Sequence, residues 1–281
     1  MTNLLKYLFV SFLLSSTWAC GQNKDYLVSI STRHGEIKAV LFDDTPEHKN
    51  NFIELAEAGR FDSTQFHRVI QSFMVQGGDV FTKEGLPANE WPTLPAEIRP
   101  KYVHRKGMIS AARQGDSVNP QKRSNGSQFF IVQGQTYGEQ ELVTDFAALQ
   151  KAVFQFMQYE DQKEFRETYS RLYQEEKFDS LTNLVISKRD EIAKTLNVKL
   201  TKDYTPEQVK MYAEIGGTPH LDFEYTIFGE VLSGMDVVDK IAAEPTTREI
   251  PNTPVYMTVT VEKVSKKKIS EEYGYVYPAS K

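Results

Sequence analysis

Cysteine is nearly absent from this chain, since Cys20 is the only one among its 281 residues. A single thiol excludes an internal disulfide framework and any metal site built from several thiolates. No histidine pair has the His-Glu-x-x-His spacing of a zinc enzyme either; the five histidines are His34, His48, His67, His104 and His220. We therefore expect neither a metal site nor a cofactor.

An excess of positive charge is lacking as well. The formal net charge is -5 and the isoelectric point is near 5.7, which argues against general attraction to nucleic acid phosphates. The hydrophobic content of 40% over 281 residues can support one large domain or two modest ones. We expect a monomer without a nucleic acid partner.

The apolar run near the N-terminus is too short for a comfortable transmembrane span. After Lys6 it covers residues 7–14, and small residues then lead to Cys20. This pattern predicts an export signal over residues 1–19. It resembles a bacterial lipoprotein signal, in which Cys20 becomes the lipidated N-terminus, although Thr17 and Trp18 depart from the usual small-aliphatic pattern. A plain secretory signal with an incidental cysteine is the alternative.

Either kind of signal would place the working domain outside the cytoplasm. We expect an exported protein of the bacterial periplasm or outer membrane, attached to the membrane by a lipid on Cys20 if the signal is processed. The polar residues 20–25 then form a short tether to the first strand.

Alternating apolar residues predict two strands over 26–31 and 36–42, which form a hairpin. A helix follows, with Thr45 as N-cap, Pro46 at its first position and Gly59 at its end. Further strand-like runs cover 64–70, 73–79, 107–113 and 127–132, and a loop rich in proline and charge covers 83–106.

The pattern changes near residue 136, where apolar residues recur at helical spacing and glycine and proline nearly disappear. A capping box at 205–208 opens a helix that ends at Gly216. We read residues 136–216 as a helical insertion. Strand character resumes over 220–231 and 255–264 around a short helix at 234–242, and residues 266–281 form a C-terminal tail that begins with three solvated lysines.

Strands from both ends of the chain suggest one closed antiparallel barrel, because closure removes edges that would pair with other chains. Three ordered segments then carry a resemblance to the cyclophilin family of prolyl isomerases. Residues 66–70 and 73–79 read FHRVI and FMVQGGD, residues 125–131 read NGSQFFI, and residues 221–229 read LDFEYTIFG. The resemblance covers about 26–135 and 217–265, implies an eight-stranded barrel capped by two helices, and leaves the insertion unexplained.

The resemblance also implies a set of site residues. Arg68 matches the catalytic arginine of the family. Its proline pocket is matched by Phe73, Met74, Phe130 and Leu221. Its substrate-binding polar groups are matched by Gln76 and Gln128, and the groove beside the proline by Ala112 and Arg113. His220 and Tyr225 stand where many members have tryptophan and histidine. Phe223 replaces a usual glycine, so a positive φ there would carry strain.

These residue types suit the chemistry of amide rotation. Resonance sets a barrier of about 18–20 kcal/mol, and the prolyl nitrogen regains a lone pair when the bond twists. A permanently charged guanidinium beside that nitrogen would favour the twisted state. The sequence thus predicts a peptidyl-prolyl cis-trans isomerase that acts on proline-containing polypeptides. The alternative is a non-catalytic chaperone or assembly module that holds clients by the groove and the insertion.

Overall fold

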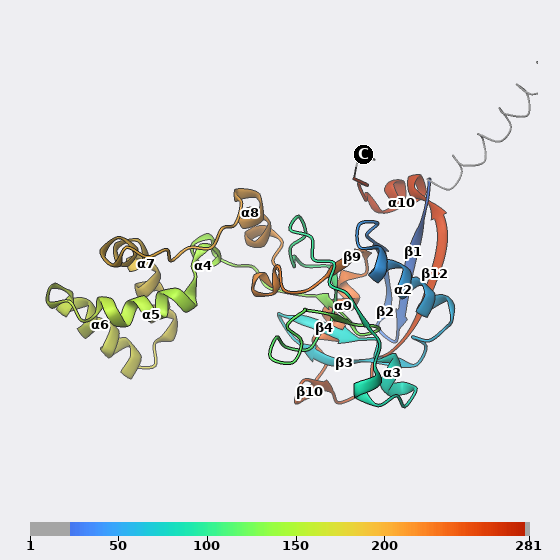
Figure 1. Ribbon diagram of the computed structural model, residues 1–281, viewed down its shortest axis with the longest axis horizontal. Coiled ribbons are helices and arrows are strands. Elements are labelled where there is room, and N and C mark those ends of the chain that lie inside the picture. Colours follow the sequence, from blue (N-terminus) through green and yellow to red (C-terminus); the bar gives the residue numbers. More distant parts are fainter. Residues whose placement is uncertain (1–22, 279–281) are drawn as a thin grey trace, which may run out of the picture. The chain divides into compact units, whose positions relative to one another are not determined.

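The computed structural model describes residues 23–278, so the expected signal and Cys20 lie outside the described residues. The chain divides into two compact units (Figure 1). The first contains the described residues up to Gln135 and again from Gly217 onward, and the second is Thr136–Gly216. These bounds are the ones that the sequence pattern predicts for the insertion.

The first unit is a closed barrel of eight antiparallel strands, which confirms the expected fold. The order around the barrel is β1, β12, β3, β4, β8, β6, β9 and β2. Their bounds are β1 Lys24–Thr32, β2 Gly35–Leu41, β3 Thr64–Ile70, β4 Met74–Gly77, β6 Met108–Ala111, β8 Phe129–Val132, β9 Ile227–Ser233 and β12 Tyr256–Ser265. The first and last strands pair along their length, so both ends of the chain contribute to one sheet.

Two helices cap this barrel, α2 (Pro46–Glu57) and α9 (Met235–Ala242). The apolar face of α2 buries Phe52 and Leu55, and that of α9 buries Val238 and Ile241. These four side chains belong to the same core cluster as the inward-facing residues of the strands. The barrel interior is therefore filled by side chains, and a ligand can be met only on its outer face.

Helix α2 begins where the sequence predicts, but its cap comes from elsewhere. The hydroxyl of Thr45 makes no capping hydrogen bond. Instead, the buried carboxylate of Glu97 accepts from the backbone N–H groups of Glu47 and His48 at 3.3 and 3.1 Å. A loop residue thus satisfies the free N–H groups that every helix start leaves.

Short elements complete the first unit, and one expected strand begins well after its predicted start. They are α3 Val80–Lys83, η1 Ala88–Glu90, β5 Thr93–Leu94, β7 Ser124–Asn125, η3 Pro219–Leu221, β10 Thr246–Thr247 and β11 Ile250–Pro251. The strand expected over 220–231 begins only at Ile227, because η3 and a turn at Phe223 come first. Phe223 has a φ of 65°, the strained conformation expected if the turn needed a positive φ.

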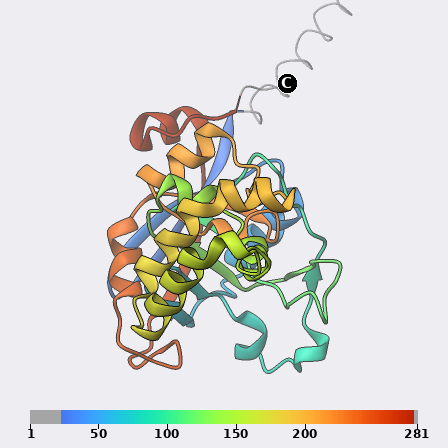
Figure 2. The same cartoon turned by 90° about the vertical axis from the view of Figure 1, so that its left-hand side faces the viewer.

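The second unit is helical. Its elements are α4 Glu139–Val143, α5 Phe146–Phe156, η2 Glu160–Gln162, α6 Lys163–Gln174, α7 Phe178–Leu196 and α8 Pro206–Glu214 (Figure 2, green to gold). Its core packs Leu149, Phe156, Phe165 and Ile192 from α5, α6 and α7. The predicted capping box is present, since Thr205 and Gln208 exchange both hydrogen bonds.

The C-terminal segment corrects one expectation. Residues 266–281 were expected to form a tail, but α10 (Lys266–Tyr273) packs by Ile269 against Leu27 and Val264. Helix α10, red in both views, lies beside β1 (Figures 1 and 2). Lys267 and Lys268 are exposed, as expected. Among the helices of residues 23–278, none is long and apolar enough to cross a membrane.

The insertion leaves the barrel and returns to it at neighbouring points of the backbone. Gln135 and Gly217 exchange two backbone hydrogen bonds, of 3.3 and 2.9 Å. Next to them Gly134 has a φ of +65°, and a Cβ there would lie 2.4 Å from the Cα of Gly217. Glycine at 134 is therefore required for this close approach.

Candidate active site

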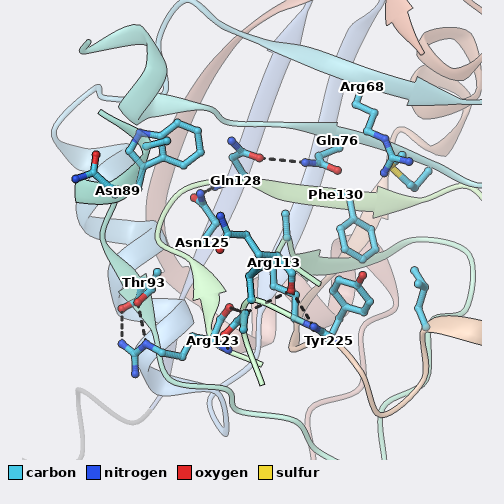
Figure 3. A pocket seen from close by; sticks show the side chains of 18 of the residues that line it. Arg68, Gln76, Asn89, Thr93, Arg113, Arg123, Asn125, Gln128, Phe130 and Tyr225 are labelled. Atoms are coloured by element: carbon cyan, nitrogen blue, oxygen red, sulfur yellow. Dashed lines mark hydrogen bonds between the residues drawn. The ribbon is translucent and has the colours of Figure 1, made fainter. Parts of the chain in front are cut away.

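One cavity of about 470 Å³ opens on the outer face of the barrel (Figure 3). It brings together ten of the eleven site residues expected from the sequence, outside the lipidation site: Arg68, Phe73, Met74, Gln76, Ala112, Arg113, Gln128, Phe130, Leu221 and Tyr225. The other lining residues are Ala88, Asn89, Trp91, Thr93, Gln114, Val118, Asn119, Arg123 and Asn125.

A β-bulge turns Arg68 towards this cavity. Phe66 pairs with Gly77, and Arg68 pairs with Gln76, so two steps on β3 correspond to one step on β4. Because neighbouring residues of β4 face opposite sides, Phe66 lies in the core and Arg68 on the outer face. Gln76 pairs in turn with Phe130 on β8. Three neighbouring strands thus place an arginine, an amide and a phenyl ring in one row.

An apolar slot lies beside this row. Met74, Phe130 and Leu221 form its buried part, and Phe73 and Tyr225 pack against them. The rings of Phe130 and Tyr225 meet edge to face, with centroids 5.8 Å apart. Such a slot has the shape and polarity to hold a small aliphatic ring and exclude water from it.

Alternation along β8 sends its two neighbouring phenylalanines to opposite faces of the strand. Phe129 belongs to the barrel core, where its ring packs edge-on against those of Phe52 and Phe61. Phe130 belongs to the cluster around the slot. One strand therefore supplies both a core residue and a wall of the cavity.

A buried histidine supports the slot from behind. The ring of His104 stacks on Phe130 with centroids 6.0 Å apart, and its Nδ1–H donates to the carboxylate of Asp222 at 3.0 Å. Burial lowers the pKa of His104, although the carboxylate opposes this shift. The ring is thus held neutral and fixed in orientation, which in turn fixes the plane of Phe130.

The guanidinium of Arg68 is held from one side only. Its Nε donates to Glu249 Oε2 at 2.6 Å, and 41% of the side chain is exposed. The described residues accept no other hydrogen bond from Arg68, so its two terminal amino groups keep their N–H donors. In Figure 3 the side chain extends towards Phe130. A donor with spare N–H groups thus stands at the mouth of the slot.

Two glutamines form a polar edge of the cavity. Gln76 Nε2 donates to Gln128 Oε1 at 3.1 Å (Figure 3). The loop before β8 is fixed because Asn125 Oδ1 accepts from the backbone N–H groups of Ser127 and Gln128 at 2.8 and 2.9 Å. This edge can donate to and accept from the backbone of an extended peptide.

Arg113 lines the cavity, but its donors are used inside the protein. Its side chain is 5% exposed. It donates to the backbone oxygen of Glu224 at 2.8 Å and to the carboxylate of Asp116 at 2.6 Å. The guanidinium also lies over the ring of Tyr225, 4.7 Å from its centroid. Arg113 therefore joins two loops and supports Tyr225.

The residues at the far end of the cavity are not predicted from the sequence. Trp91, Asn89 and Thr93 come from the loop over residues 83–106, for which the sequence indicates only a high content of proline and charge. Arg123 closes this end by donating from Nε to the hydroxyl of Thr93 and from Nη2 to its backbone oxygen, both at 2.8 Å. A tryptophan within a polar loop, in a chain with only two, was the available signal.

His220 does not line the cavity, in contrast to the other expected residues. It lies on η3, is exposed, and packs against Phe73 with ring centroids 5.2 Å apart. Its contribution to the slot is indirect, since it supports Phe73 from outside.

Comparison with known proteins gives a consistent result. The family model described as cyclophilin type peptidyl-prolyl cis-trans isomerase matches residues 27–168 and 202–265. A peptidyl-prolyl cis-trans isomerase of Arabidopsis thaliana is 39% identical over 116 residues, which are 40% of this chain and 66% of the relative. The residues matched by the family model cover most of the described barrel.

Bacterial relatives match over a longer stretch. A Staphylococcus haemolyticus protein named for a proposed peptidyl-prolyl cis-trans isomerase activity is 27% identical over 224 residues, 79% of this chain and 82% of the relative. A Streptococcus pyogenes protein named for a proposed phosphatase and isomerase activity is 29% identical, and this chain spans 34% of its length. A Cryptosporidium parvum cyclophilin structure covers 85% of this chain and 98% of its own, with a TM-score of 0.49 and 19% identity.

Proposed function

Since this chain belongs to the cyclophilin-type peptidyl-prolyl cis-trans isomerase family, we propose that it isomerises X-Pro bonds with Arg68 as the catalytic residue. The observation that carries the proposal is the position of Arg68. Its spare N–H donors stand beside a slot walled by Phe130 and Leu221, within one cavity.

The proposed mechanism needs no nucleophile. The slot holds the pyrrolidine ring while the preceding segment rotates, and the prolyl nitrogen becomes pyramidal and basic as amide resonance is lost. The guanidinium of Arg68 then donates to a lone pair that the planar ground state does not offer. Because this hydrogen bond exists only near the transition state, it raises the rate without tightening substrate binding.

Other groups must share the stabilisation. An acceleration of about five powers of ten requires roughly 7 kcal/mol, whereas one charged hydrogen bond contributes about 1.5–3 kcal/mol. The remainder comes from fixing the peptide. Gln76 and Gln128 bind its backbone, and the apolar walls exclude water around the Arg68 contact.

The test compares isomerisation of a short X-Pro peptide by the wild-type protein and by Arg68→Ala. We expect kcat/KM to fall about 100-fold, the order found for removal of one preorganised donor. Arg60→Ala is a matched control, because Arg60 pairs with Glu84 and does not line the cavity. Equal rates for the wild-type protein and Arg68→Ala would remove the mechanism.

We also propose that the protein is exported, lipid-anchored through Cys20 and monomeric, and that its clients are exported polypeptides. The pattern of residues 1–20 in the sequence supports export and the lipid anchor. The test is mass spectrometry of the protein from membranes of a bacterial expression host, beside Cys20→Ser. An unmodified cysteine within an uncleaved or differently cleaved N-terminus would contradict the anchor.

A second candidate function is client binding without catalysis. It is favoured by exposed aromatic side chains on the insertion: Phe154, Tyr159, Tyr173 and Phe178 are 52%, 45%, 60% and 55% exposed. Apolar surface of this kind is typical of binding sites. Suppression of aggregation of an unfolded protein would be compared between the wild type and a variant lacking residues 136–216. Equal suppression would contradict this second function.

A further inference from the structure

The hairpin of β10 and β11 has an unusual turn. It contains two residues, Arg248 and Glu249, with φ values of 51° and 67°. Turns of this kind use glycine, asparagine or aspartate, since other residues are strained at positive φ. Strain of this kind persists where the surrounding structure requires it and is concentrated at functional sites. A contact made by the Glu249 side chain would explain why glutamate occupies this strained position.

Glu249 is bonded to the strand that carries Arg68. Its backbone oxygen accepts from the N–H of Val69 at 2.7 Å, and its Oε2 accepts from Arg68 Nε at 2.6 Å. Two hydrogen bonds to consecutive residues thus fix the turn against β3. The residues are 181 positions apart in the sequence, so the pairing depends on barrel closure.

The choice of nitrogen matters for the reaction. Nε lies at the base of the planar guanidinium, and a carboxylate bound there leaves both terminal amino groups to the substrate. A carboxylate bound to those amino groups would compete with the substrate instead. Binding at Nε also limits rotation about the last side-chain bonds of Arg68, whose side chain is otherwise 41% exposed.

We propose that Glu249 is a positioning residue, which holds the Arg68 guanidinium so that its terminal N–H groups face the prolyl nitrogen. This inference rests on the proposed function of Arg68. Without the carboxylate, Arg68 samples other rotamers, and a smaller fraction of bound substrate meets a correctly oriented donor. The apolar slot is untouched, so kcat falls while KM changes little.

The experiment measures kcat and KM on a short X-Pro peptide for Glu249→Gln and Glu249→Asn. We expect kcat to fall about three- to fivefold in both, with KM within about 1.5-fold, in the range measured for exposed ion pairs. Asparagine adopts positive φ readily, so Glu249→Asn keeps the turn and its thermal stability. Lost activity in that variant cannot then be ascribed to the turn.

A double-mutant cycle with Arg68→Lys tests the coupling directly, because lysine has a single amino group and lacks the planar fork of N–H donors that Glu249 is proposed to orient. Glu249→Gln is expected to have almost no further effect on kcat in that background. Glu262→Gln on β12 is the matched control, an exposed carboxylate away from the cavity, and should retain wild-type values.

Three outcomes would overturn the inference: wild-type kcat in both Glu249 variants, a change in KM alone, or an equal effect of Glu249→Gln with and without Arg68→Lys. Failure of the proposed function has a different signature. In that case Arg68→Ala is as active as the wild-type protein, and the role of Glu249 is rejected with it.

Discussion

Arg68 and Arg113 line the same cavity, but their surroundings give them different chemistry. Arg113 has a side chain 5% exposed, and its guanidinium donates to Glu224, Asp116 and Gln114. Arg68 is 41% exposed and donates to one carboxylate. Residue type alone would suggest two cationic groups for a ligand. The hydrogen bonds leave Arg68 with the spare N–H donors that the proposed mechanism uses, and they make Arg113 a support for Tyr225.

Arg113→Lys tests this division. Lysine carries the charge but lacks the planar fork that joins Glu224 to Asp116 and covers Tyr225. We expect KM for an X-Pro peptide to rise about three- to tenfold, because the wall of the slot becomes mobile, while kcat stays within about twofold. A fall in kcat at constant KM would instead mean that Arg113 acts in the transition state.

Much of the site can be predicted at the residue scale, because consecutive motif residues carry it. Arg68, Gln76 and Phe130 lie in short motifs, so the sequence identifies them as site residues. The sequence does not show that they lie on the same face of the sheet, since this depends on the bulge at Phe66 and Arg68. Glu249 could not be predicted, because its partner is distant along the chain and the pairing exists only in the closed barrel.

At the scale of elements, the positions of strands and helices follow from local sequence patterns, but the long-range hydrogen bonds that hold them in place do not. The start of α2 is signalled by Thr45 and Pro46, yet Glu97 supplies the cap from a distant loop. Glu97 also accepts from Nδ1 of His48 at 2.7 Å, and His48 Nε2 accepts from the hydroxyl of Ser124. One carboxylate thus connects a capping helix to β7 beside the cavity.

Removing the carboxylate of Glu97 should lower the free energy of unfolding more than removing an exposed carboxylate. Glu97→Ala leaves the first N–H groups of α2 and the buried His48 without their acceptor. We expect the free energy of unfolding to fall by about 2–4 kcal/mol, measured by urea denaturation. Glu90→Ala is the control, since Glu90 is exposed on η1. An equal effect of both substitutions would show that the cap contributes little.

At the scale of the whole molecule, three histidines make stability depend on pH. Burial lowers the pKa of His48, His67 and His104 below the ordinary value of 6.5, against the opposing pull of Glu97, Asp79 and Asp222. Below pH 6.5 the unfolded chain therefore binds protons that the folded chain does not. Stability is present above this pH and is lost as the pH falls towards the folded-state pKa values.

We expect the free energy of unfolding to be lower at pH 5.5 than at pH 7.5. The slope can reach about 1.4 kcal/mol per pH unit for each histidine. Urea denaturation at several pH values measures it, and His104→Asn should reduce the slope whatever its effect on stability itself. A stability independent of pH over this window would show that these rings bind as many protons in the folded chain as in the unfolded one.

The insertion gives a further prediction at this scale. Gln135 and Gly217 are hydrogen-bonded neighbours on antiparallel backbones, so a two-residue Asn-Gly turn can replace residues 136–216. We expect this variant to unfold cooperatively and to keep kcat/KM for a short peptide within about threefold. Loss of folding would show that the barrel needs the insertion.

The close approach of the backbones at Gly134 and Gly217 also has a consequence for protein engineering. The chain leaves the barrel at Gln135 and returns at Gly217, and these two residues are hydrogen-bonded neighbours. An inserted segment of any length therefore only needs its two ends to lie close together. The entropic cost of a longer insertion also grows only slowly with its length. The junction at Gln135 and Gly217 is therefore suited to domain insertion. A fluorescent domain or an affinity module whose own termini lie close together could be grafted at this point while the opposite strands continue to close the barrel.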